Sequence, residues 1–238
     1  MTGNGLLIGF GAIPCFQTGF FLSGEGESIV PLLLLCLASA VLAYLCGSIN
    51  TALLVSKTLY GKDIREYGSR NAGLTNMHRV FGLKGAAFTL VGDIAKAVIA
   101  VLIGMCLCGY QYGGYLALLF CVIGHAWPCF FGFKGGKGVL SAATGIACLS
   151  PATFFVLIGL FLLMVLTTRY VSVGSVTAAF FFPLTLRAFL QVLPFVVMAS
   201  SLLTCLLVIF LHRENVRRLI RGEEKKFGHH EPPSGEGE

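Results

Sequence analysis

Long apolar runs separated by short polar stretches form the dominant pattern of the chain. Three clear runs lie at residues 31–57, 85–108 and 114–131. Each is at least as long as the roughly 17 residues that the shortest membrane-crossing helices use. The pattern therefore predicts a membrane protein built from helices.

The region from residue 138 to residue 211 is also apolar, but polar or proline-containing stretches interrupt it three times. We divide it at these points into the segments 138–149, 152–168, 171–188 and 191–211. The first of these segments is too short to span a bilayer in the usual way. We expect it to pack inside the bundle, where non-standard backbone is tolerated.

Basic residues gather in three polar stretches, at 57–84, at 132–138 and after residue 212, which hold 14 of the 17 Lys and Arg residues. Basic residues in short loops mark the cytoplasmic side of a membrane. All three stretches lie on one face only if the chain crosses an even number of times between 138 and 212. The predicted fold is therefore an all-α integral membrane bundle of seven transmembrane segments, with the N-terminus outside and the C-terminus cytoplasmic.

Composition supports this class, because 56% of the residues are hydrophobic and 12% are charged, against about 25% charged in soluble domains. The nine cysteines lie mostly inside apolar runs and form no CxxC pair. We therefore expect packing cysteines, with no disulfide and no metal site. Residues 1–28 are expected to be an N-terminal extension, either an interfacial segment or a translation artefact, and residues 228–238 a disordered tail.

The most distinctive polar stretch is Gly-Phe-Lys-Gly-Gly-Lys-Gly at residues 132–138. Glycines such as Gly135 and Gly136 let backbone N–H groups turn toward a bound anion, and Lys134 and Lys137 supply positive charge. The nucleotide P-loop needs Ser or Thr after its lysine, but Gly138 follows Lys137. The loop therefore indicates phosphate binding without nucleotide hydrolysis.

The stretch from Asp63 to Asn76 is rich in small hydrogen-bonding residues, among them Ser69 and Asn71. It could wrap an anion or be an ordinary polar hairpin between helices. Ser48, at the end of the first apolar run, could donate to phosphate or cap the helix backbone.

Ionisable residues inside predicted spans are costly and usually pair or line a polar cavity. Asp93 and Lys96 are three positions apart on one helical face, so they form either a structural ion pair or a substrate contact. We expect His125 to orient the adjacent loop rather than to act as a catalytic base. His212 and Asn215 also share a face and could hold a small polar substrate.

These stretches together strongly resemble the bacterial acyl-phosphate:glycerol-3-phosphate acyltransferases, small integral membrane enzymes that begin phospholipid synthesis. The resemblance covers residues 31–227, so residues 29–227 are expected to form one acyltransferase membrane domain. The matching pieces begin at Gly47, Asp63, Asp93, Gly124, Phe133, Thr168 and His212. Seven such pieces in order are far more specific than any one alone.

The resemblance implies transfer of an acyl group from acyl-phosphate to the 1-hydroxyl of sn-glycerol 3-phosphate, giving 1-acylglycerol 3-phosphate and phosphate. It implies no cofactor and no metal, a location in the bacterial inner membrane among lipids, an active site toward the cytoplasm, and no nucleic-acid partner. The residues that it places in catalysis are Ser48, Lys134, Ser172, His212 and Asn215. The expected substrate-binding residues are Lys57, Arg65, Ser69, Asn71, Asn76, Asp93, Lys96, His125, Gly135, Gly136 and Lys137.

Three places depart from the family pattern: Asn50 stands where proline is common, Arg70 where glycine is frequent, and Leu140-Ser141 where the family has Ala-Thr. A transporter for a phosphorylated metabolite is the rival function, but we find no repeat between the two halves, as transporter folds usually have. A lipid-binding scaffold would explain the basic tail, whose Arg213, Arg217 and Arg221 form a helical stripe suited to anionic lipid. It would leave the glycine-lysine loop without a role.

Overall fold

A computed structural model describes residues 29–190 and 194–228 of the chain, and these residues form helices and connecting loops. The α-helices are α2 (Ile29–Ser48), α3 (Thr51–Tyr60), α4 (Leu74–Cys108), α5 (Gly114–Ala126), α6 (Val139–Leu149), α7 (Pro151–Thr168), α8 (Val171–Phe189), α9 (Phe195–Leu211) and α10 (Arg213–Ile220). The shorter turns are η1 (Ile64–Glu66), the π-helical η2 (Gly109–Gly113) and η3 (Cys129–Phe131). The expected extension at 1–28 and the tail beyond Gly228 lie outside the described residues.

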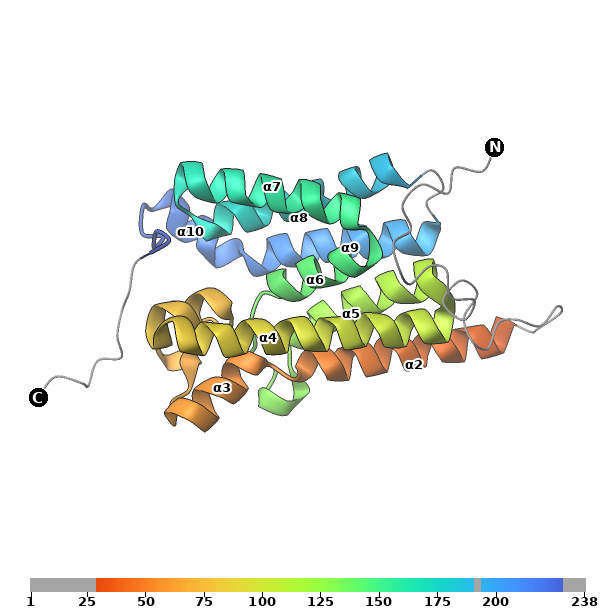
Figure 1. The fold of residues 1–238 in the computed structure, drawn as a ribbon, viewed down its shortest axis with the longest axis horizontal. Coiled ribbons are helices and arrows are strands. Elements are labelled where there is room, and N and C mark those ends of the chain that lie inside the picture. The colour runs from red at the N-terminus through yellow and green to blue at the C-terminus, as the bar shows by residue number, and fades with distance from the viewer. Residues whose placement is uncertain (1–28, 191–193, 229–238) are drawn as a thin grey trace, which may run out of the picture.

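The long helices run side by side in an elongated bundle with two groups (Figure 1). Helices α2, α4 and α5 contact one another in one group, and α7, α8 and α9 form the other, with α8 between its neighbours. The short α6 lies between the groups and contacts α4, α5 and α7. Helices α3 and α10 lie at the same end of the molecule, so the polar loops that flank them gather there.

Two glycines allow α2 and α5 to pack with their backbones in close contact. A Cβ atom added to Gly47 of α2 would collide with the carbonyl of Cys121, and one added to Gly124 of α5 would collide with that of Tyr44. Small residues permit this kind of approach between membrane helices. The contact fixes the end of α2 against the end of α5, where the polar loops begin.

Five helical stretches in the described residues are long and apolar enough to cross a membrane, and the bent pair α9–α10 makes a sixth if it is counted as one span. Large apolar side chains such as Phe155 and Leu166 are 70% and 77% exposed, as expected for helices that face lipid. The structure thus confirms an all-helical membrane protein. The predicted short segment at 138–149 is present as α6, with contacts to both groups.

The first predicted span, 31–57, is confirmed as the apolar stretch Val30–Tyr60, but it is divided into two helices, because α2 ends at Ser48 and α3 begins at Thr51. Asn50 sits between them in an extended conformation, and its side-chain oxygen accepts from the Leu53 N–H at 3.0 Å. This is an N-cap, the arrangement that best satisfies the free donors of a new helix. Asn50 also donates to the Ala72 carbonyl at 3.3 Å, which anchors the following loop.

The polar stretch predicted at 57–84 is also partly helical, because α4 begins at Leu74 rather than near residue 85. Met77 and Val80 are buried against Leu53 of α3, so packing stabilises this polar-looking turn as helix. Gly82 has left-handed backbone (φ 68°) and kinks α4 at the point where the polar part meets the apolar part.

Helix α7 ends at Thr168 and is followed by the C-cap residue Arg169, which has left-handed backbone (φ 63°) and is exposed. This conformation destabilises the folded state by about 1 kcal/mol or more for a residue with a Cβ atom, but not for glycine. We predict that Arg169→Gly raises the free energy of unfolding by about 1 kcal/mol, measured as a higher thermal midpoint in detergent. Arg169→Ala keeps the Cβ atom and is the control, so equal midpoints for the two variants would contradict the prediction.

Candidate active site

A cavity of about 500 Å³ opens among the polar loops and extends into the bundle. Its inner part is lined by apolar side chains of α6 to α9, which include Leu140, Ile146, Phe154, Leu157, Phe161, Phe182 and Val208. Its outer part is polar and contains the predicted site residues Ser69, Asn71, Asn76, Asp93, His125, Lys137, Ser172, His212 and Asn215. The cavity is therefore amphipathic, with a polar mouth that leads into an apolar interior.

Positive charge exceeds negative charge at the polar end of the cavity. Arg70, Arg79, Lys137, Arg218 and Lys225 line it, against the carboxylates of Glu224 and Asp93. The Asp93 carboxylate is 2.8 Å from the Lys96 ammonium, so its charge is already balanced. The remaining excess favours an anionic ligand.

Glu224 joins three of the side chains around the cavity. One of its carboxylate oxygens accepts from Ser172 at 2.9 Å and from Asn215 at 2.6 Å, and the other accepts from Arg218 at 2.9 Å. Burial alone would raise the pKa of Glu224, but these hydrogen bonds hold the pKa below its ordinary value. Glu224 is thus a carboxylate that fixes the predicted site residues Ser172 and Asn215 in place.

Lys137 reaches the same cluster from the glycine-lysine loop and donates to the side-chain oxygen of Asn215. Burial lowers the pKa of Lys137 to about 8; nearby Glu224 opposes this shift, and Arg218 and Arg79 add to it. A lysine that is desolvated and surrounded by other cations gains most from a bound anion.

The glycine-lysine loop folds back on the end of α5. Gly135 and Gly136 donate their backbone N–H groups to the carbonyls of Ala126 at 3.0 Å and His125 at 3.1 Å. Gly136 has no room for a Cβ atom, because the Ala72 carbonyl and the His125 ring lie against it. These contacts place Lys137 at the cavity, while the N–H groups of Gly135 and Gly136 are used within the protein instead of facing a ligand.

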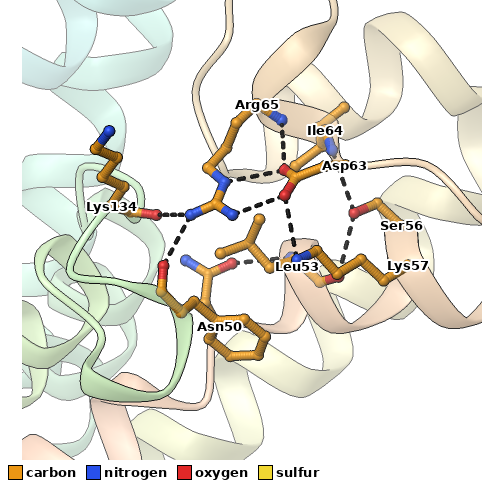
Figure 2. Close-up of polar contacts among 9 residues, drawn as sticks. Asn50, Leu53, Ser56, Lys57, Asp63, Ile64, Arg65 and Lys134 are labelled. Carbon is orange, nitrogen blue, oxygen red and sulfur yellow. Dashed lines mark hydrogen bonds and ion pairs between the residues drawn. The ribbon is translucent and has the colours of Figure 1, made fainter.

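A second polar cluster braces the outside of this loop (Figure 2). Asp63 accepts from the Arg65 guanidinium at 2.7 and 2.9 Å and pairs with Lys57 at 3.2 Å. Arg65 in turn donates to the carbonyls of Phe131 at 2.8 Å and Lys134 at 3.0 Å. Hydrogen bonding from Arg65 lowers the pKa of Asp63. Lys57 and Arg65, both predicted to bind substrate, make contacts that hold the loops together beside the cavity.

The structure does not bring Lys134 or Ser48 to the cavity. The Lys134 side chain is exposed and extends away from the cluster in Figure 2, where only its carbonyl interacts with Arg65. The Ser48 hydroxyl is fully buried and accepts from the Cys129 N–H at 3.4 Å. The structure thus places Lys137 at the cavity and Lys134 outside it, with Arg65 bonded to the backbone of the loop that carries them.

Asn76 organises the loop that forms one wall of the cavity. Its side-chain oxygen accepts from the Ser69 N–H at 2.9 Å, and its nitrogen donates to the carbonyls of Tyr67 at 3.0 Å and Ile64 at 3.3 Å. With its amide used in this way, Asn76 shapes the loop, whereas Ser69 and the neighbouring Asn71 are left to line the cavity.

Two histidines reach the cavity from opposite groups of helices. His125, at the end of α5, has its Nδ1 atom 2.9 Å from the Lys96 ammonium. His212, between α9 and α10, has its Nδ1 atom 2.8 Å from the Val208 carbonyl. Lys96 therefore lies behind His125 rather than in the cavity wall.

The sequence-based prediction missed Arg79, Arg218 and Glu224. Arg218 follows His212 and Asn215 at successive intervals of three residues, so the helical period could have placed it on the same face. Glu224 lies beyond α10 and is brought back by the chain after Ile220, which no local pattern indicates.

Residues 37–222 match the glycerol-3-phosphate acyltransferase family. A glycerol-3-phosphate acyltransferase of Thermoanaerobacter sp. (strain X514) is 40% identical over 190 residues, which cover 80% of this chain and 94% of that protein. One from Clostridioides difficile (strain 630) is 39% identical over 201 residues, covering 79% and 94% of the two chains.

The fold is similar to crystal structures of PlsY (YgiH), an integral membrane glycerol 3-phosphate acyltransferase. The glycerol 3-phosphate form superposes with a TM-score of 0.74 at 36% identity, covering 81% of this chain and 96% of that one. The lysophosphatidic acid form has a TM-score of 0.72 at 34% identity, covering 82% and 96%. The chain therefore belongs to the glycerol-3-phosphate acyltransferase family of membrane enzymes.

Proposed function

We propose that this protein transfers a fatty acyl group from acyl-phosphate to the 1-hydroxyl of sn-glycerol 3-phosphate, giving 1-acylglycerol 3-phosphate and phosphate. The observation that carries the proposal is the amphipathic cavity. Its cationic mouth suits the phosphates of both substrates, and its apolar interior suits a fatty acyl chain. The crystal forms of PlsY with glycerol 3-phosphate and lysophosphatidic acid support the same substrate and product for this chain.

Acyl-phosphate is an activated acyl donor, so the reaction needs positioning and charge neutralisation more than a nucleophilic residue. The substrate hydroxyl attacks the carbonyl carbon, the new ester bond forms, and the bond to the phosphate oxygen breaks. The hydroxyl proton passes to the departing phosphate or to His212. Lys137 and Arg218 stabilise the negative charge that remains on the phosphate.

The roles of the other residues follow from their places around the cavity. Asn215, held by Glu224, has a second amide N–H that can donate to a phosphate oxygen at the polar end, and Ser172 donates there when its O–H leaves Glu224. Ser69 and Asn71, in the loop wall, contact the glycerol phosphate. Ser48, Lys57, Arg65, Asp93, Lys96 and Asn76 maintain the shape of the site, and Lys134 lies outside it.

The described helices and the distribution of basic residues support a seven-segment topology in which α6 completes the count. The N-terminus is then outside and the polar end of the cavity faces the cytoplasm, where glycerol 3-phosphate is available. We place the protein in the bacterial inner membrane and its reaction at the first step of phospholipid synthesis.

The direct test incubates purified protein with acyl-phosphate and glycerol 3-phosphate and measures lysophosphatidate by mass spectrometry. We expect product without added coenzyme A, nucleotide or metal. A folded sample that forms no lysophosphatidate would reject the proposed reaction. A covalent acyl-enzyme detected by intact mass would reject direct transfer while leaving the substrates in place.

Lys137 is the side chain whose loss should be most costly. We predict that Lys137→Ala lowers kcat/KM by at least about 100-fold, because a buried charge opposite the phosphate is removed. Lys134→Ala should lower kcat/KM by less than about fivefold, because the charge of an exposed side chain contributes little. Arg217→Ala, which removes an exposed cation of α10 paired with Glu214, is the control for general loss of basic charge. A larger loss for Lys134→Ala than for Lys137→Ala would contradict the assignment.

The lowered pKa of Lys137 predicts an alkaline limit to activity. Below pH 8 the side chain is charged and binds the anion; above its pKa of about 8 it is neutral, so kcat/KM should fall as the pH rises toward 9.5. In Lys137→Arg the guanidinium stays charged, so the ratio of kcat/KM at high pH to that at pH 7 should be larger than in the wild type. The same alkaline decline in both proteins would show that another group causes it.

A further inference from the structure

We infer that Lys96 is a positioning residue that fixes His125 as an N–H donor toward a phosphate oxygen at the polar end of the cavity. The inference rests on the proposed function, because it takes the ligand of the cavity to carry a phosphate group. The buried Asp93–Lys96 ion pair then determines which ring nitrogen of His125 carries the proton.

Three acceptors surround the Lys96 ammonium. The Asp93 carboxylate lies at 2.8 Å, the Nδ1 atom of His125 at 2.9 Å and the Ile49 carbonyl at 3.0 Å. An ammonium group has three N–H donors and no lone pair. Because the ammonium can only donate, Nδ1 of His125 must be the acceptor in its pair.

A histidine whose Nδ1 accepts a hydrogen bond carries its proton on Nε2. His125 lines the cavity and Lys96 does not, so the ring nitrogen available to the cavity is Nε2, the one that does not face Lys96. Nε2 lies beside Gly136, where an added Cβ atom would collide with it, and Gly136 directly precedes Lys137 in the loop. The N–H group thus lies at the polar end of the cavity where Lys137 brings its charge. The two groups can bind the same phosphate, the lysine through charge and the histidine through one directed hydrogen bond.

His212 has the opposite arrangement across the cavity. Its Nδ1 atom lies 2.8 Å from the Val208 carbonyl, which can only accept, so Nδ1 carries the proton. In the neutral ring the Nε2 atom of His212 is then an acceptor. The cavity holds one histidine fixed as a donor and one fixed as an acceptor, which matches a phosphate oxygen on one side and a hydroxyl proton on the other.

The tautomers can be measured directly by solid-state NMR of protein labelled with ¹⁵N-histidine in lipid bilayers. We expect His125 with its proton on Nε2 and His212 with its proton on Nδ1, each assigned by the signal that its Gln variant lacks. In the double variant Asp93→Asn/Lys96→Met, which removes both buried charges together, His125 should populate the Nδ1–H form. A wild-type His125 with its proton on Nδ1 would overturn the inference.

The kinetic test uses two amides that differ only in reach. His125→Gln places a donor near the position of Nε2, whereas His125→Asn places its amide near Nδ1 and leaves the cavity without a donor. We expect His125→Asn to raise KM for a phosphate substrate by about 10- to 100-fold, the loss typical of a hydrogen bond to a charged group, while His125→Gln stays within about fivefold of the wild type. Equal KM values for the two variants would contradict the role.

Separate KM measurements for glycerol 3-phosphate and acyl-phosphate identify which phosphate His125 contacts. An increase for one substrate alone assigns the hydrogen bond to that phosphate, and an increase for neither overturns the inference. Failure of this inference can be distinguished from failure of the proposed reaction. If the wild-type protein forms no lysophosphatidate, the proposed reaction is wrong, but the NMR experiment still decides the tautomers and the part that Lys96 plays in them.

Discussion

The buried ammonium of Lys96 is the interaction on which the arrangement of the site depends. A charge inside a membrane bundle costs several kcal/mol unless partners surround it. The counter-charge, Asp93, comes from α4 itself, and two uncharged acceptors come from the break between α2 and α3 and from the end of α5, so the ammonium is fully surrounded only when these elements meet. Since the glycine-lysine loop folds back on the last turn of α5, its position follows from the same requirement.

Hydrophobic length predicted the helices well, because each apolar run must satisfy its backbone polar groups internally. It failed at Asn50, where a side-chain cap starts a new helix inside an apolar run. It also failed at 74–84, where burial of Met77 and Val80 stabilises a turn that looks polar in sequence. Caps and packing partners lie outside the apolar pattern, so they could not be found from it.

The candidate site could be predicted as a set of segments but not as a set of side chains. The sequence brought the glycine-lysine loop and the region after residue 212 to one face, and the cavity joins them. Whether Lys134 or Lys137 faces that cavity depends on the contacts of Arg65 with the loop backbone, which come from a segment about 70 residues away. Glu224 was missed because an acidic residue is unexpected where an anion binds, yet it orients Ser172 and Asn215.

The glycine contact between α2 and α5 also limits how the protein can move. Backbones that touch at Gly47 and Gly124 cannot slide past one another without breaking that contact, so this pair of helices behaves as a rigid frame beside the cavity. Helix α7 lies on the opposite side and exposes most of its surface to lipid. The apolar interior of the cavity, which suits an acyl chain, therefore lies between this fixed pair of helices and α7 and α8, whose side chains also line it. A change in lipid packing around α7 and α8 would then act on the shape of the cavity itself.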